Sequence, residues 1–165
     1  MNTPIFLECL RRMVPCAVLG AWSAFGSGCA SYQVAYSPAA VAANSPTAQV
    51  VGRAELYPLA TKYVAEHPGT DYMVGSGDSM EPLYKDHTVI ITEPMPISGL
   101  KPGMTVVYLG DSGHPIAHVL VKKTSDGWIA MGGGNPRCDI QSVREENYIA
   151  TVVAAYEPRN RSFDP

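Results

Sequence analysis

The chain has little positive charge and no basic cluster. Of its 165 residues, 12 are lysine or arginine and 15 are aspartate or glutamate, which gives a formal net charge of -3. The longest basic runs are the pairs Arg11-Arg12 and Lys122-Lys123. Because nucleic-acid binding relies on a basic patch that meets the phosphates, we expect no nucleic-acid partner.

Cysteine is also scarce, and its placement suggests no disulfide framework. Cys9 and Cys16 lie in the N-terminal segment, which leaves Cys29 and Cys138 for the rest of the chain. The paired cysteine or histidine spacing of a zinc site is missing, and so is the glycine motif of a nucleotide-binding loop. The sequence therefore predicts no internal disulfide, no metal and no cofactor.

The N-terminal segment has the pattern of an export signal. Arg11-Arg12 precede an apolar run over residues 13–25, small residues follow, and no further charge occurs before Arg53. The apolar run is short for a membrane span, which needs roughly 20 residues. We therefore favour a cleaved signal peptide over residues 1–28, with an uncleaved membrane anchor as the alternative.

Small residues lead up to Cys29 in "FGSGCASYQ", and this stretch resembles the lipobox of bacterial lipoproteins. The resemblance implies that Cys29 is lipidated and becomes the mature N-terminus, which would tether the domain to a membrane leaflet without spanning it. The alternative is an ordinary signal peptide that is cut nearby. Either way we expect a protein exported to the bacterial cell envelope, on the periplasmic side. The residue after Cys29 is Ala30 rather than aspartate, which makes the outer membrane a candidate location.

Two segments with different compositions follow Cys29. Residues 29–52 are mostly small, contain proline and carry no charge, which predicts a flexible linker. From Arg53 onward the pattern is that of a folded domain over residues 53–165. Apolar residues at helical spacing predict one short helix over residues 57–66, with Pro58 in its first turn.

Beyond this helix the sequence predicts strands. Six short runs are rich in valine, isoleucine, threonine and tyrosine and are separated by glycine, proline, aspartate and serine. They cover residues 71–74, 87–92, 104–109, 115–123, 127–131 and 148–156. Because no helix is expected between these strands, we predict a mostly β fold, with a coiled or barrel-like antiparallel sheet and one short N-terminal helix.

The connection after the first of these strands contains Ser79, in "VGSGDSMEPLYKDH". Its glycines allow a sharp turn and a close approach of the backbone to a substrate. A serine hydroxyl is a weak nucleophile until a neighbouring base takes its proton. His118 is a candidate base, because it is a polar ring in the apolar strand "PIAHVLVK" and imidazole is mostly neutral at pH 7. The alternatives are a simple turn serine and a hydrogen-bonded core histidine.

Asp139 follows the next predicted strand and is a candidate third member of the site. It could orient His118 and complete a Ser-His-Asp arrangement, or it could be a loop carboxylate. Lys122 and Lys123 would supply a base if the strand register differed. Two adjacent lysines at a strand end, however, are expected in solvent.

These segments resemble the signal peptidases, a group that also includes the LexA-like self-cleaving repressors. "GDSMEPLYKDHTVII" is similar to the nucleophile segment, "KPGMTVVYL" to the strand that follows it, and "PIAHVLVK" to the base-bearing strand of the histidine-type members. The resemblance spans residues 71–156 and implies the signal-peptidase catalytic fold. It implies Ser79 as nucleophile, His118 as general base, and an extended polypeptide substrate that is cut after small residues. The residues that match the substrate-contacting part of the motif are Gly77, Asp78, Met80 and Pro82.

The sequence also departs from this family pattern. Val119 stands where the histidine-type enzymes have an arginine, and Gly133 stands where they have an aspartate, whereas a second family aspartate corresponds to Asp139. These departures keep open an alternative function, a catalytically inactive lipoprotein that retains the fold as a binding module. LexA-like self-processing is a third hypothesis, although the usual DNA-binding helical domain does not precede the strands in this sequence.

Overall fold

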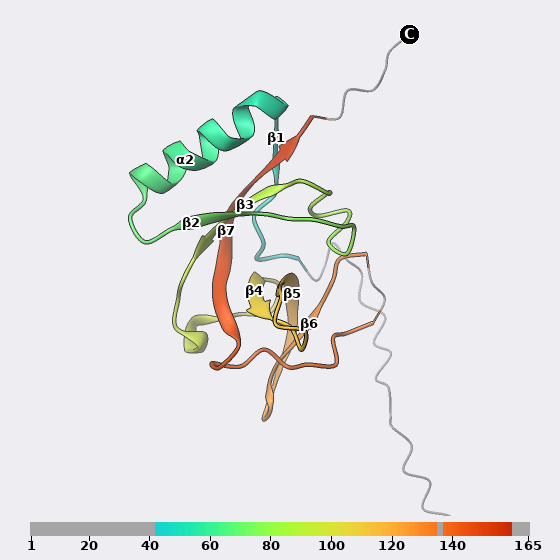
Figure 1. Ribbon diagram of the computed structural model, residues 1–165. Helices are drawn as coiled ribbons and strands as arrows, with labels where there is room; N and C mark the ends of the chain where they lie inside the picture. Colours follow the sequence, from blue (N-terminus) through green and yellow to red (C-terminus); the bar gives the residue numbers. More distant parts are fainter. Residues whose placement is uncertain (1–41, 135–136, 160–165) are drawn as a thin grey trace, which may run out of the picture. The chain divides into compact units, whose positions relative to one another are not determined.

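The computed structural model describes residues 42–134 and 137–159. The expected signal peptide, Cys29 and the first part of the expected linker lie outside these residues. These residues form one α-helix, seven strands and two 3-10 turns, η1 and η2, and Figure 1 shows how the helix and the strands are arranged. In chain order the elements are β1 (Gln49–Val51), η1 (Arg53–Glu55), α2 (Leu56–Glu66), β2 (Asp71–Val74), β3 (Val89–Glu93), η2 (Ile97–Gly99), β4 (Thr105–Leu109), β5 (Pro115–Thr124), β6 (Gly127–Met131) and β7 (Tyr148–Pro158).

The seven strands form one sheet. Its order is β2-β3-β7-β4-β5-β6, and β1 pairs with β7 outside this path. All pairs are antiparallel except β1 with β7, which is parallel. The prediction of a mostly β fold with one short helix is therefore confirmed. The expected barrel-like closure is not found in the described part of the chain, because the sheet is open, with β2 and β6 at the two ends of the order. Register shifts in three strand pairs increase the local twist without closing the sheet.

Helix α2 packs on β3. Its buried residues Leu56 and Ala60 belong to the same apolar cluster as Val89 and Ile91 of β3. Ile90 points to the opposite face of that strand, because successive side chains alternate. It belongs to a second cluster, together with Met80 and Tyr84 from the long connection between β2 and β3. That connection, which carries Ser79, is thus anchored in the core by two of its own side chains.

Residues 42–52 belong to the folded domain, so the predicted linker over residues 29–52 is wrong in this part. Val51 is buried in β1, which pairs with the end of β7. Before β1, Ser45 Oγ lies 2.7 Å from Thr105 Oγ1, and the Tyr84 hydroxyl donates to the Pro46 carbonyl oxygen at 2.8 Å. The small, uncharged residues suggested flexibility. Val50 and Val51, however, pair with Glu157 and Pro158 at the end of β7, beyond the residues that pair with β4.

We expect a chain that starts at Arg53 to be less stable than one that starts at residue 42. The shorter chain loses the burial of Val51, worth about 2 kcal/mol, and at least two hydrogen bonds, worth about 1 kcal/mol each. The expected decrease in the free energy of unfolding is therefore about 3 to 4 kcal/mol. Urea unfolding of both chains, followed by the fluorescence of the buried Trp128, measures the difference. Equal unfolding midpoints would show that residues 42–52 do not stabilise the domain.

Candidate active site

The turn that carries Ser79 is closed at its base by backbone hydrogen bonds. After the last β2–β3 pair, the Gly75 N–H donates to the Thr88 carbonyl at 2.8 Å, and the His87 N–H donates to the Gly75 carbonyl at 3.1 Å. The Gly77 N–H donates to Asp86 Oδ1 at 3.0 Å. This bond, the largest of several influences, lowers the pKa of the Asp86 carboxyl below its usual range. The turn is therefore a defined structure rather than a flexible loop.

Ser79 is exposed between anchored neighbours. The Glu81 N–H donates to the Asp78 carbonyl at 3.0 Å, and the Tyr84 N–H donates to the Met80 carbonyl at 3.0 Å. Met80 and Tyr84 are buried, with exposed fractions of 7% and 4%. Because both ends of this short segment are fixed, the Ser79 side chain is held at the surface in one place.

The structure brings Ser79, His118 and Asp139 together. Ser79 Oγ lies 3.3 Å from His118 Nε2, and His118 Nδ1 lies 2.7 Å from Asp139 Oδ2. A ring nitrogen that faces a carboxylate carries the proton, so the neutral ring presents Nε2 to Ser79 as an acceptor. The distance to Ser79 is slightly long, as is common in sites without substrate. The geometry is that of a Ser-His-Asp triad.

The sheet positions His118 and Asp139. His118 lies on β5 opposite Val106 of β4, and only 7% of its surface is exposed. Asp139 follows β6, and its N–H donates to the Ala130 carbonyl at 2.8 Å. The Cys138 backbone also bridges to Met131 at the end of β6. Asp139 is therefore attached to the sheet beside His118, although it lies outside any strand.

A contact that sequence reasoning missed involves Tyr108 on β4. Its hydroxyl donates to Asp139 Oδ2 at 2.6 Å, the same oxygen that faces His118. The available sequence signal was a tyrosine in the strand "TVVYL", since a buried tyrosine hydroxyl usually needs a partner. Nothing in the sequence indicated which residue would be that partner.

The glycine run 132–134 packs directly against the Ser79 turn. A Cβ atom on Gly132 would lie 2.5 Å from the Ser79 carbonyl oxygen and 3.0 Å from His118 Nε2. A Cβ atom on Gly133 would lie 2.9 Å from the carbonyl oxygens of both Met80 and Glu81. The Gly134 N–H donates to the Ser79 carbonyl at 3.1 Å. An aspartate at Gly133 would therefore collide with this backbone, which gives the departure from the family pattern a packing explanation.

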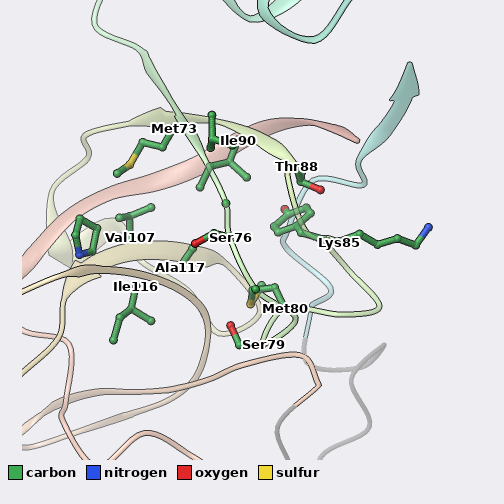
Figure 2. A pocket seen from close by; sticks show the side chains of 15 residues that line it. Met73, Ser76, Ser79, Met80, Lys85, Thr88, Ile90, Val107, Ile116 and Ala117 are labelled. Atoms are coloured by element: carbon green, nitrogen blue, oxygen red, sulfur yellow. The ribbon is translucent and has the colours of Figure 1, made fainter. Parts of the chain in front are cut away.

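A cavity of about 350 Å³ opens beside Ser79. Figure 2 shows Met73 and Ile90 across the cavity from Ile116 and Ser79, with Met80 next to the serine. Gly77 and Met80 line this cavity, as the family resemblance implies for substrate contacts. Asp78 and Pro82 are exposed in the turn and do not line it. The wall is mostly apolar and draws on β2, the Ser79 turn and the start of β5.

The lysines near the site do not take the position of a base. Lys122 and Lys123 are exposed at the far end of β5. Lys123 Nζ lies over the Trp128 ring, 5.8 Å from its centre. Lys85 lines the cavity, but its Nζ pairs with Glu157 Oε1 at 2.6 Å, and Figure 2 shows its side chain extending away from the other lining residues. The register of β5 thus places histidine, and not lysine, next to Ser79.

The remaining candidate groups are not arranged for catalysis or metal binding. Burial, reinforced by Asp139, raises the pKa of the half-buried Cys138 thiol, which disfavours a thiolate nucleophile. His67, His87 and His114 are exposed. Within residues 42–134 and 137–159, no three side chains of the metal-binding types gather at one point. In the same ranges, no helix has the length and hydropathy to cross a bilayer.

No known protein-family profile matches the chain, and a search of curated proteins found no significant match.

Proposed function

We propose that this protein is a serine endopeptidase of the signal-peptidase type. The observation that supports this most strongly is the hydrogen-bonded series of Ser79 Oγ, His118 and Asp139 at the edge of a cavity. The order of the three groups and the hydrogen bonds between them are those that acyl transfer by a serine nucleophile uses. The exposed Ser79 hydroxyl is open to a substrate, whereas the base is shielded from water.

In the proposed mechanism, Ser79 Oγ attacks the carbonyl carbon of the scissile bond while His118 Nε2 takes its proton. Asp139 holds the ring in the required tautomer and stabilises the cation that forms. The tetrahedral intermediate collapses by breaking the C–N bond, and His118 gives its proton to the leaving amine. Water then hydrolyses the acyl ester by the reverse sequence of proton transfers. No cofactor takes part.

The oxyanion of the intermediate needs hydrogen-bond donors, and we assign the backbone N–H of Ser79 as one of them. Gly77, two residues earlier, has no side chain to offer. The Gly134 N–H binds the Ser79 carbonyl, which fixes the peptide plane between Ser79 and Met80. The rigid turn would thereby preorganise the backbone around the nucleophile.

An extended peptide fits the two strand edges that line the cavity. β2 is the end strand of the sheet, and residues 115–118 of β5 pair with β4 but lie outside the β5–β6 register. Main-chain groups on such edges are suited to binding a peptide by strand addition. A preference for small residues at the scissile bond, and for exported polypeptides, follows from the resemblance to signal peptidases. In this proposal a lipid on Cys29 anchors the domain to an envelope membrane.

Acylation by a fluorophosphonate probe tests the function. We expect the chain from residue 42 onward to be labelled on Ser79, as located by mass spectrometry, and the Ser79→Ala variant to be unlabelled. Ser112→Ala, which changes an exposed loop serine, is the matched control and should label normally. Labelling should occur at neutral pH and decline in acid, where imidazole takes up a proton; labelling only above about pH 9 would indicate a lysine base.

An absence of labelling from pH 6 to 10 would contradict the peptidase proposal. The inactive peptide-binding lipoprotein would then become the better account of the same cavity.

A further inference from the structure

Tyr108 is a buried tyrosine whose hydroxyl contacts the proposed triad but not the proposed substrate cavity. Its exposed fraction is 1%, and it does not line the cavity beside Ser79. Its hydroxyl donates to Asp139 Oδ2 at 2.6 Å, while His118 Nδ1 lies 2.7 Å from that same oxygen. One carboxylate oxygen therefore has two donors.

The β4–β5 hairpin places the tyrosine and the histidine on one face. Val106 lies opposite His118, and Tyr108, two residues further along β4, lies opposite Ile116. Tyr108 and His118 are thus diagonal neighbours, close enough for an aromatic side chain to reach across. Their ring centres are 6.5 Å apart, with an angle of 63° between the planes. This edge-on arrangement lets both polar tips point to Asp139.

Asp139 needs such a partner more than His118 does. It lies outside the strands and is half-buried, with 17% of its side chain exposed, whereas the side chain of His118 is 9% exposed. A carboxylate at the edge of solvent is free to turn toward water unless a second group holds it. The Tyr108 hydroxyl is rigidly placed by the core cluster around Val106 and Leu120.

We propose that Tyr108 is a positioning residue of the peptidase, which holds the Asp139 carboxylate in line with His118 Nδ1. This inference rests on the proposed function and adds a fourth residue to the triad. Tyr108 touches neither substrate nor the reacting atoms, so it acts through Asp139. Burial, together with the nearby carboxylate, raises the pKa of Tyr108, and its hydroxyl therefore remains a donor throughout the working pH range.

The Tyr108→Phe substitution removes the hydroxyl and keeps the ring. We expect kcat for peptide cleavage to fall about 10- to 100-fold, since a displacement on the order of 1 Å at a catalytic group costs up to about 100-fold. KM should stay within about two-fold of the wild-type value, because Tyr108 does not line the cavity. Tyr148→Phe is the matched control, since it removes a hydroxyl that lies 2.8 Å from Thr151 Oγ1 of the same strand, β7. This control should leave kcat unchanged.

A double-mutant cycle separates positioning from general packing. If Tyr108 acts only through Asp139, adding Tyr108→Phe to an Asp139→Asn chain should lower kcat no further. The proposal would be overturned if the loss of kcat in the double variant equalled the product of the losses in Tyr108→Phe and Asp139→Asn. An unchanged kcat in Tyr108→Phe alone would overturn it too.

A second measurement decides the point even if the chain proves inactive. The His118 Nδ1 proton should give a low-field, slowly exchanging NMR signal in the wild type and in Tyr148→Phe. In Tyr108→Phe this signal should be lost to exchange with water. A wild type that neither cleaves peptides nor reacts with the fluorophosphonate would refute the proposed function. A signal that persists in Tyr108→Phe would refute the role of Tyr108 alone.

Discussion

Replacing Asp139 with asparagine should lower kcat about 10⁴-fold while leaving the fold intact, as the equivalent change does in peptidases with a Ser-His-Asp triad. The carboxylate accepts a hydrogen bond from the His118 Nδ1–H at 2.7 Å. In the asparagine variant the NH₂ group can occupy the position of Oδ2, which faces both His118 Nδ1 and the Tyr108 hydroxyl. One N–H would then donate to Nδ1, and the hydroxyl can turn to accept the other. The ring would carry its proton on Nε2 instead and could no longer take one from Ser79. Steady-state kinetics on a peptide substrate measures the loss.

The control for this substitution is Asp126→Asn. Asp126 is exposed and pairs with Arg144 at the surface, so its neutralisation should leave kcat unchanged. A loss of less than about tenfold in Asp139→Asn would contradict the triad and indicate a Ser-His dyad, in which Asp139 is only a neighbour of the base.

Gly133→Asp should damage the site, although aspartate is the residue in the pattern that this sequence resembles. The new Cβ would lie 2.9 Å from the carbonyl oxygens of Met80 and Glu81, and these are backbone atoms close to Ser79. Relief of the clash requires the Ser79 turn to move, and a displacement of about 1 Å is expected to lower kcat up to about 100-fold. The added carboxylate would also lie near these two carbonyl oxygens, and it would be repelled by them because all of these groups are hydrogen-bond acceptors. We further expect about 1 to 3 kcal/mol of destabilisation from overpacking.

Two further variants show how much of the loss in Gly133→Asp comes from the Cβ atom alone and whether any glycine substitution would cause it. Gly133→Ala introduces the Cβ alone and should cause part of the loss. Gly99→Ala, whose Cβ would lie 3.6 Å from the nearest atom, Met95 Cε, should have no effect on kcat. An increase in activity in Gly133→Asp would contradict the close packing described here and would mean that Gly133 had weakened the site.

The sheet and the helix were predictable because they follow from local patterns. Runs rich in β-branched residues and tyrosine, such as "TVVYL" and "PIAHVLVK", predicted β4 and β5, and the helix predicted over residues 57–66 matches Leu56–Glu66 with Pro58 in its first turn. β1 was missed because its three residues follow a long run of small ones. Its pairing with β7 is a contact between segments about a hundred residues apart in sequence, which no local pattern reports. The open sheet likewise depends on long-range pairing.

The site was only partly predictable. Ser79 and His118 were recognisable from their motifs, and Asp139 from its order in the chain. Tyr108 was not, because its contact with Asp139 forms through space across 31 positions. Gly133 was read as the loss of a functional aspartate, whereas in the structure it is a position without room for a side chain. Residue types indicated the chemistry, but the packing around them was available only from the fold.

The docking of residues 42–48 on the domain sets the reach of the proposed anchor. The Pro46 carbonyl accepts a hydrogen bond from Tyr84, a residue of the cavity wall, so the chain is fixed beside the cavity at Pro46. If Cys29 carries lipid, residues 29–41 alone separate membrane and domain, and they span at most about 45 Å when fully extended. A linker that ran to residue 52 would have allowed about 80 Å. The cavity would therefore work on polypeptides close to the surface of the leaflet that holds the anchor.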